Sequence, residues 1–176
     1  MLVVNLLGGP GCGKSTLAAH VFAELKWDDI NCELVTEAAK DAAWEGHLRL
    51  FEYGQLLFFG EQYRRLRRLD GQVDVVVTDS PLILELVYAN NDSIPSFLKT
   101  ILEAHNSFDN LNFLVRRVKE YIKVGRNNEE SEARQLDSLI EDMLQENRMR
   151  YKSLPGVRAS VPYIVLKVKE RLGTGR

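Results

Sequence analysis

The chain has 176 residues, 45% of them hydrophobic and 27% charged, and its formal net charge at pH 7 is −2. These values are typical of one globular domain with a sizeable core, and no apolar run is long enough to cross a membrane. The charge balance excludes the strongly basic character of a general nucleic-acid binder, although two local basic clusters remain.

The two cysteines, Cys12 and Cys32, have neither the spacing of a zinc site nor that of a disulfide framework. The short apolar run at the N-terminus lacks the basic residues that begin a signal peptide, so we interpret it as a core strand. Together these features favour a cytoplasmic protein that does not enter a membrane.

The first predicted strand, residues 2–7, leads directly into a glycine-rich loop, and a helix is predicted over about 14–26. This order, with the spacing G-x-x-x-x-G-K-S, is typical of a phosphate-binding loop. Backbone N–H groups would surround the phosphates of ATP, Lys14 would reach the β- and γ-phosphates, and Ser15 would hold Mg²⁺. We expect the nucleotide-binding residues to be Gly8, Gly9, Pro10, Gly11, Cys12, Gly13, Lys14, Ser15 and Thr16.

The second predicted strand, residues 32–36, ends next to Glu37, and a short helix is expected over 38–44. Ligands of open α/β sheets bind at the carboxyl ends of the strands. Glu37 is therefore a candidate general base for an acceptor hydroxyl, with Lys40 and Asp41 lining the acceptor site. A glutamate that stabilises the start of a helix is an equally good interpretation.

A long helix is predicted over residues 48–68, where apolar side chains leave little polar face, so it is buried nearly all round or lines a cavity. Its polar exceptions, Gln55 and Gln62, could read the edge of a nucleobase, although glutamines are more often exposed. Four arginines, at positions 64, 65, 67 and 68, suit the negative end of the helix dipole and could also hold a polynucleotide backbone.

The third predicted strand, residues 73–78, is rich in β-branched side chains and is followed by Asp79. At the carboxyl end of this strand, Asp79 would lie beside the phosphate-binding loop and hold Mg²⁺ together with Ser15. It could also accept the proton of an attacking hydroxyl, or cap the following turn. Which of Glu37 and Asp79 takes the proton stays open.

Helices are predicted near residues 83–89 and 94–106, a fourth strand over 111–115, and a basic loop over 116–128. This loop could act as a lid, in which Arg116 and Arg126 stabilise the charge of a transferred phosphoryl group and Arg117 reaches the acceptor. A solvated basic turn that faces the acidic start of the next helix is the alternative.

Residues 129–147 have apolar positions at helical spacing, residues 154–162 are expected to form a loop, and a fifth strand is predicted over 163–168. The alternation of strands and helices predicts a single α/β domain of three layers. Its five-stranded sheet would be mainly parallel, with helices on both faces.

Two absences bear on the reaction. The chain lacks the Asn-Lys-x-Asp element of guanine specificity, which disfavours a GTPase switch. Motor-type ATPases resemble one another in having a glutamate after the aspartate of the third strand, whereas Ser80 follows Asp79 here. The chain therefore favours a kinase, with a non-catalytic nucleotide-binding module as the alternative.

Residues 8–16, 35–41, 73–82 and 112–119 together resemble small phage-type P-loop kinases, which are similar to the thymidylate kinase family. This group includes the 5-hydroxymethyluracil DNA kinases, which phosphorylate the hydroxymethyl group of the base during thymidine hypermodification. The resemblance implies a three-layer P-loop kinase domain that uses ATP and Mg²⁺ on a nucleotide or DNA acceptor. It also implies the host cytoplasm if the chain is encoded by a phage.

Thymidylate kinases carry Asp-Arg at the end of the third strand, whereas this chain has Asp79-Ser80-Pro81. Without that arginine, an acceptor hydroxyl is favoured over a free monophosphate. By analogy with the deoxynucleoside kinases, the resemblance also gives Glu37 the role of general base. The leading hypothesis is 5-hydroxymethyluracil in DNA as acceptor, and the alternative is a deoxynucleoside monophosphate kinase; monomer and homodimer both stay open.

Overall fold

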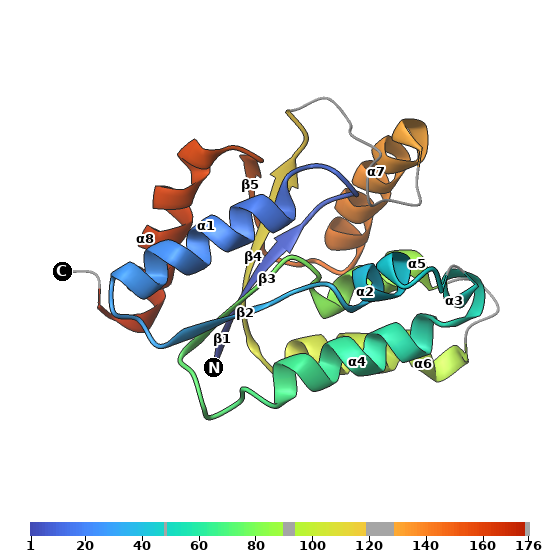
Figure 1. Cartoon of the computed structure of the whole chain (residues 1–176), viewed down its shortest axis with the longest axis horizontal. Helices are drawn as coiled ribbons and strands as arrows, with labels where there is room; N and C mark the ends of the chain where they lie inside the picture. Colours follow the sequence, from blue (N-terminus) through green and yellow to red (C-terminus); the bar gives the residue numbers. More distant parts are fainter. Residues whose placement is uncertain (48, 90–93, 119–128, 175–176) are drawn as a thin grey trace.

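The computed structural model describes residues 1–47, 49–89, 94–118 and 129–174 (Figure 1). Its centre is a sheet of five strands in the order β2-β3-β1-β4-β5, and every neighbouring pair is parallel. The strands are β1 (Leu2–Leu7), β2 (Cys32–Val35), β3 (Val75–Thr78), β4 (Asp109–Arg116) and β5 (Lys152–Pro155). The predicted α/β class is confirmed.

Helices cover both faces of this sheet, so the molecule has three layers (Figure 1). One face carries α1 (Lys14–Trp27) and α8 (Val161–Leu172), and the other carries α4 (Gln55–Arg67), α6 (Pro95–Asn106) and α7 (Glu130–Glu146). Three short helices complete the fold: α2 (Ala38–Trp44), α3 (Leu50–Tyr53) and α5 (Glu85–Tyr88). No helix in the described part of the chain is both long and apolar enough to span a bilayer.

The alternation of side chains along β1 divides the core between the two faces. Val4 and Leu6 pack in the cluster that includes α1 and α8, whereas Val3 and Leu7 pack in the cluster that includes α4, α6 and α7. All of them are buried, as in central strands of parallel sheets, which are covered on both sides.

The prediction of the fifth strand is wrong. Residues 163–168 belong to α8, and β5 lies in the segment that was expected to be a loop. The buried residues of α8 recur at helical spacing: Val161, Ile164, Val165 and Val168. Their β-branched character favours a strand locally, but packing against α1 decides the helix. In β5, an edge strand, only Leu154 is buried, so its sequence carries little hydrophobic signal.

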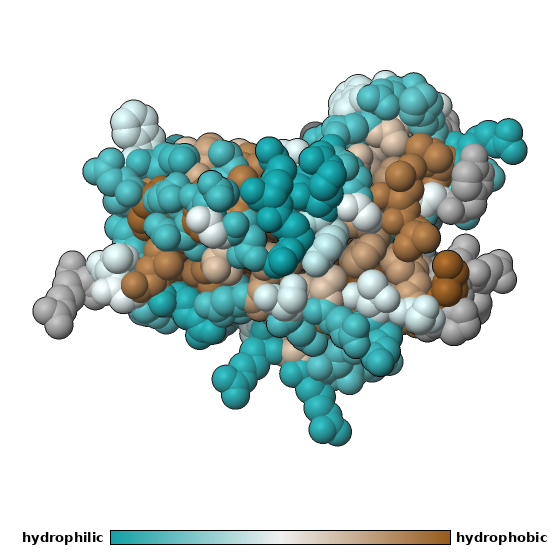
Figure 2. Space-filling view, turned by 90° about the horizontal axis from the view of Figure 1, so that it is seen from below, coloured by the Kyte–Doolittle hydropathy of each residue, from teal (hydrophilic) through white to brown (hydrophobic). Residues whose placement is uncertain are grey.

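The long helix predicted over 48–68 is interrupted at Gly54, between α3 and α4. A Cβ atom at Gly54 would lie 2.4 Å from the carbonyl oxygen of Leu50, so the tight turn there needs glycine. The helix is also not buried all round, because Leu56 and Leu57 are exposed. Figure 2 shows hydrophobic surface gathered toward the end of the molecule where α4 and α6 begin.

Candidate active site

The glycine-rich loop after β1 is shaped by positive backbone angles and by close neighbours. Gly8 has φ of 145° and Gly13 has φ of 103°, values that side-chain-bearing residues rarely adopt. A Cβ atom at Gly8 would lie 2.7 Å from the Sγ atom of Cys12. Lys14 Nζ donates hydrogen bonds to the carbonyl oxygens of Gly8 at 2.7 Å and Gly9 at 3.0 Å, so its ammonium group lies against the loop.

Two distant segments hold this loop in place, and sequence reasoning missed both. The Gly9 N–H donates to Asp137 Oδ1 of α7 at 2.8 Å. After β5, Gly156 packs so tightly that a Cβ atom there would lie 2.1 Å from the carbonyl oxygen of Cys12. The Pro-Gly pair indicated only a turn at Gly156, and Asp137 is one of many polar residues on an amphipathic helix.

Asp79 lies where the end of β3 meets the phosphate-binding loop, because β1 and β3 are neighbours in the sheet. Its side chain is only 4% exposed, and Oδ1 has no hydrogen-bond partner in the part of the chain that the structure describes. The alternative that Asp79 caps the following turn is not supported, because the structure shows no side-chain cap hydrogen bond there. A buried, unsatisfied carboxylate oxygen fits a cation ligand.

The donor set suits Mg²⁺, which prefers oxygen ligands and keeps several sites for substrate phosphates and water. Ser15, in the first turn of α1, and Asp79 line the same cavity and offer a hydroxyl and a carboxylate. Among the described residues no group of three or more His, Cys, Asp or Glu side chains could hold a metal ion by itself. Any Mg²⁺ ion here would therefore complete its ligand sphere with a nucleotide.

A cavity of about 400 Å³ extends from the phosphate-binding loop to α2, α3, α4 and α5. At the loop end it is lined by Lys14, Ser15 and Asp79. Its far wall is mostly apolar and contains four aromatic side chains: Trp44, Phe51, Phe58 and Tyr88. Lys40 and Gln55, two of the four predicted acceptor residues, also line the cavity, and their role there stays a prediction.

Three ionisable side chains meet on one side of this cavity. Glu37 lies between β2 and α2, and Glu85 and Tyr88 belong to α5. Burial raises the pKa of Glu85 to about 8, and the negative charge of Glu37 adds to the effect. Burial also raises the pKa of Tyr88, with smaller contributions from Glu37 and Glu85. Sequence reasoning missed Glu85, because a single glutamate in an apolar segment does not reveal its burial.

Gln62 also lines the cavity, and the alternative that it is exposed is wrong. Its side chain is 1% exposed. Gln62 Oε1 accepts a hydrogen bond from the Ala38 N–H at 3.0 Å, and Nε2 donates to Thr78 Oγ1 at 3.4 Å. The amide therefore joins α4 to the start of α2 and to the carboxyl end of β3.

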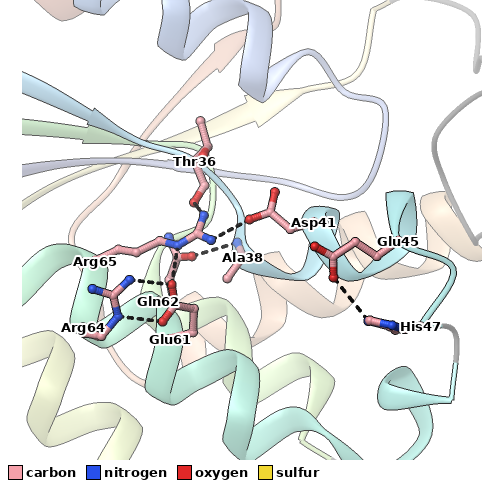
Figure 3. A network of polar contacts seen from close by, with 9 residues as sticks. All are labelled: Thr36, Ala38, Asp41, Glu45, His47, Glu61, Gln62, Arg64 and Arg65. Carbon is pink, nitrogen blue, oxygen red and sulfur yellow. Dashed lines mark hydrogen bonds and ion pairs between the residues drawn. The ribbon is translucent and has the colours of Figure 1, made fainter.

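Arg65 of α4 also contacts the segment that leads from β2 into α2 (Figure 3). Its guanidinium donates to the Thr36 carbonyl oxygen at 3.3 Å, to Asp41 at 2.5 Å and to Glu61 at 3.0 Å. Arg64 also pairs with Glu61, and Arg67 pairs with Asp70. Most of the arginine cluster at the end of α4 is thus paired with carboxylates of the same chain, which weakens the case for a polynucleotide site there.

The structure shows where two arginines of the predicted lid, Arg116 and Arg117, are engaged. Arg116 ends β4 and forms an ion pair with Glu141 of α7, while Arg117 Nε donates to Asp137 Oδ2 at 2.9 Å. The Arg117 side chain is only 6% exposed, and neither arginine lines the cavity. Both join β4 to α7, and Arg117 Nη2 lies 3.3 Å from the place that a Cβ atom on Gly9 of the phosphate-binding loop would take. Their roles toward a phosphate or an acceptor stay predictions. Arg126 and the rest of the basic loop, residues 119–128, lie outside the described residues.

Comparison with models of protein families gives a match. The sequence model of a family described as an AAA domain matches residues 3–162, from β1 to the start of α8. No curated protein matches the chain. The match covers most of the chain, including the phosphate-binding loop and all strands of the parallel sheet, and it indicates a nucleotide-binding domain. The chain therefore belongs to this AAA domain family, with the fold of a P-loop NTPase.

Proposed function

We propose that the protein is an ATP- and Mg²⁺-dependent kinase that transfers the γ-phosphate to a hydroxyl group of a nucleotide-type acceptor. The observation that carries the proposal is the cavity of about 400 Å³ that continues from Lys14 and Asp79 to an aromatic wall. A hydrolase needs room for only a water molecule beside the γ-phosphate. A kinase needs a second, shaped site for an organic acceptor, and the part of this cavity beyond the phosphate-binding loop is our candidate for it.

Each side chain at the loop end has a role in this proposal. The loop N–H groups and Lys14 bind the phosphates, and Ser15 and Asp79 would hold Mg²⁺. The bound Mg²⁺ would neutralise charge on the phosphate oxygens. Glu37 would accept the proton of the acceptor hydroxyl, since β2 and β3 are neighbours and both Glu37 and Asp79 line the cavity.

The charges of the cavity favour an uncharged acceptor group over a monophosphate. Among its described lining residues the only cations are Lys14 and Lys40, and no arginine is present to clamp a second phosphate. The more specific proposal is the hydroxymethyl group of 5-hydroxymethyluracil in DNA. The base would have to leave the helix to enter a cavity of this size. A deoxynucleoside monophosphate kinase is the alternative, and Lys40 is the residue that could support it.

The test uses γ-labelled ATP with Mg²⁺ and four sets of acceptors. These are DNA containing 5-hydroxymethyluracil, matched DNA containing thymine, the free nucleoside 5-hydroxymethyl-2′-deoxyuridine, and a panel of deoxynucleoside monophosphates. We expect label in the hydroxymethylated acceptors and none in thymine DNA. Label in diphosphates alone would favour the monophosphate kinase. Release of inorganic phosphate at the same rate with and without acceptor would contradict a kinase and favour an NTP hydrolase.

A further inference from the structure

Glu85 is a buried carboxyl group that the fold itself does not satisfy. It belongs to α5 and lines the cavity, and its side chain is 8% exposed. Its Oε2 atom is fully buried and has no hydrogen-bond partner in the described part of the chain. Leaving such a group without a partner costs roughly 1–3 kcal/mol of folding stability. A polar group kept at this cost in the wall of a cavity points to a ligand.

The surroundings of Glu85 favour its protonated form. The charged groups that share the cavity with it are Lys14, Glu37, Lys40 and Asp79. Burial has the largest effect and Glu37 the next, and together they raise the pKa of Glu85 to about 8. A protonated carboxyl group presents an O–H donor beside a C=O acceptor. This pair matches an adjacent C=O and N–H on a ligand, which is the lactam edge of a nucleobase.

Other features of the wall leave this role to Glu85. The amide of Gln62 would offer the same donor and acceptor pair, but it is occupied by Ala38 and Thr78. The aromatic side chains Phe51, Phe58 and Tyr88 line the same cavity and provide apolar surface for a planar ring. A flat heterocycle with one polar edge therefore fits the chemistry of the wall.

We propose that Glu85 selects the acceptor by pairing its carboxyl group with the lactam edge of a nucleobase, as in pyrimidine-2,4-diones. The inference rests on the proposed function, because it takes the cavity to be the acceptor site. The base would lie against the aromatic side chains with its lactam edge toward α5. Its hydroxyl-bearing group would be directed toward Glu37 and the phosphate-binding loop.

The test measures binding by calorimetry, without phosphate transfer. Two probes are compared: 5-hydroxymethyl-2′-deoxyuridine and its N3-methyl derivative, in which the N–H donor of the edge is blocked. We expect wild type to bind the first probe about tenfold or more tightly than the second, since two paired hydrogen bonds are lost. Glu85→Leu should bind both equally weakly. Glu85→Gln should keep the preference, because an amide offers the same pair of groups.

Glu45→Gln is the matched control, because Glu45 is an exposed glutamate that contacts His47 and does not line the cavity (Figure 3). It should leave both affinities unchanged. Thermal unfolding of each variant checks the fold. Equal binding of the two probes by wild type overturns the proposal. So does a preference for the unmodified probe over the N3-methyl derivative that survives in Glu85→Leu. Failure of wild type to bind the unmodified nucleoside overturns it as well.

The outcomes for Glu85 and for the kinase are separate. Selective binding of the unmodified nucleoside without label transfer to any acceptor would contradict the kinase and leave Glu85 as a base-reading residue. Label transfer to both probes at equal rates would support the kinase and remove Glu85 from acceptor selection.

Discussion

The two ends of the cavity differ in which parts of the chain form them. At the phosphate end, most of the site comes from one continuous segment of glycines, backbone groups and Lys14, and Asp79 is added from the end of β3. At the far wall, the side chains come from four helices, α2 to α5, and only their packing brings them together. Binding of a phosphate group can therefore be encoded largely by a local motif, whereas selection of an acceptor depends on the tertiary structure.

The largest expected effect lies at the phosphate end. Lys14→Ala removes the ammonium group that lies against the loop, and it should lower phosphoryl transfer by about 10²–10³-fold. The rate of label transfer measures this, and calorimetry with Mg²⁺ and ATP measures the accompanying loss of affinity. Lys99→Ala is the control, because Lys99 is exposed on α6 and pairs only with Glu103 among the described residues. Near-normal transfer by Lys14→Ala would place the chemistry elsewhere.

The second prediction concerns the far wall and its response to pH. Below pH 4.5 the Glu85 carboxyl is protonated in both the folded and the unfolded chain, so it adds no pH dependence. Between pH 4.5 and about 8 the unfolded chain loses this proton and the folded chain keeps it. The free energy of unfolding should therefore fall as pH rises through this window, and Glu85→Gln should remove that fall.

Denaturant unfolding of wild type and Glu85→Gln at several pH values measures this difference, which we expect to reach a few kcal/mol, since one pKa unit corresponds to about 1.4 kcal/mol. Taking the difference between the two proteins cancels groups that they share. One of these is His105, whose pKa burial lowers to about 4 and which destabilises the fold in acid. A constant difference across the window would mean that Glu85 is ionised throughout.

Lys14 and Glu85 also show how much of the site can be predicted from the sequence. Lys14 follows from a short motif, because the spacing of glycines and lysine alone sets the backbone that holds phosphate. Asp79 and Glu37 follow from their places after predicted strands, since strand ends meet at one edge of a parallel sheet. Glu85 follows from nothing local, because its burial depends on helices distant in the sequence.

In the fold, too, features with a local sequence signal could be predicted, and features that depend on distant packing could not. The first four strands were predicted from apolar runs between turns, and the structure places strands within or close to those ranges. The fifth was misplaced, because the β-branched residues of α8 suit either element and β5 buries only Leu154. The ion pairs of Arg116 and Arg117 with α7 were invisible as well, since arginines beside a phosphate-binding site and arginines in a structural ion pair look alike in sequence.

The third prediction tests the long-range support of the phosphate end. Gly156→Ala would place a Cβ atom 2.1 Å from the Cys12 carbonyl oxygen, so the loop or β5 must shift. We expect a loss of about 1–3 kcal/mol of folding stability and weaker ATP binding. Gly60→Ala is the matched control in α4, where an added Cβ meets nothing within 4 Å. It should stabilise the helix by about 0.5–1 kcal/mol and leave ATP binding unchanged.

The smallest expected effect is at the far wall, where contacts are numerous and individually weak. Phe51 lines the cavity, and its ring centroid lies 5.2 Å from that of Phe58. Phe51→Ala should weaken binding of 5-hydroxymethyl-2′-deoxyuridine by several-fold to about tenfold, because apolar surface against the base is lost, and should leave ATP affinity unchanged. Leu57→Ala, at an exposed position of α4 that does not line the cavity, should change neither affinity. If Phe51→Ala instead weakened ATP binding as much as nucleoside binding, the two ends of the cavity would be one site, and their separation into a phosphate end and an acceptor wall would have to be abandoned.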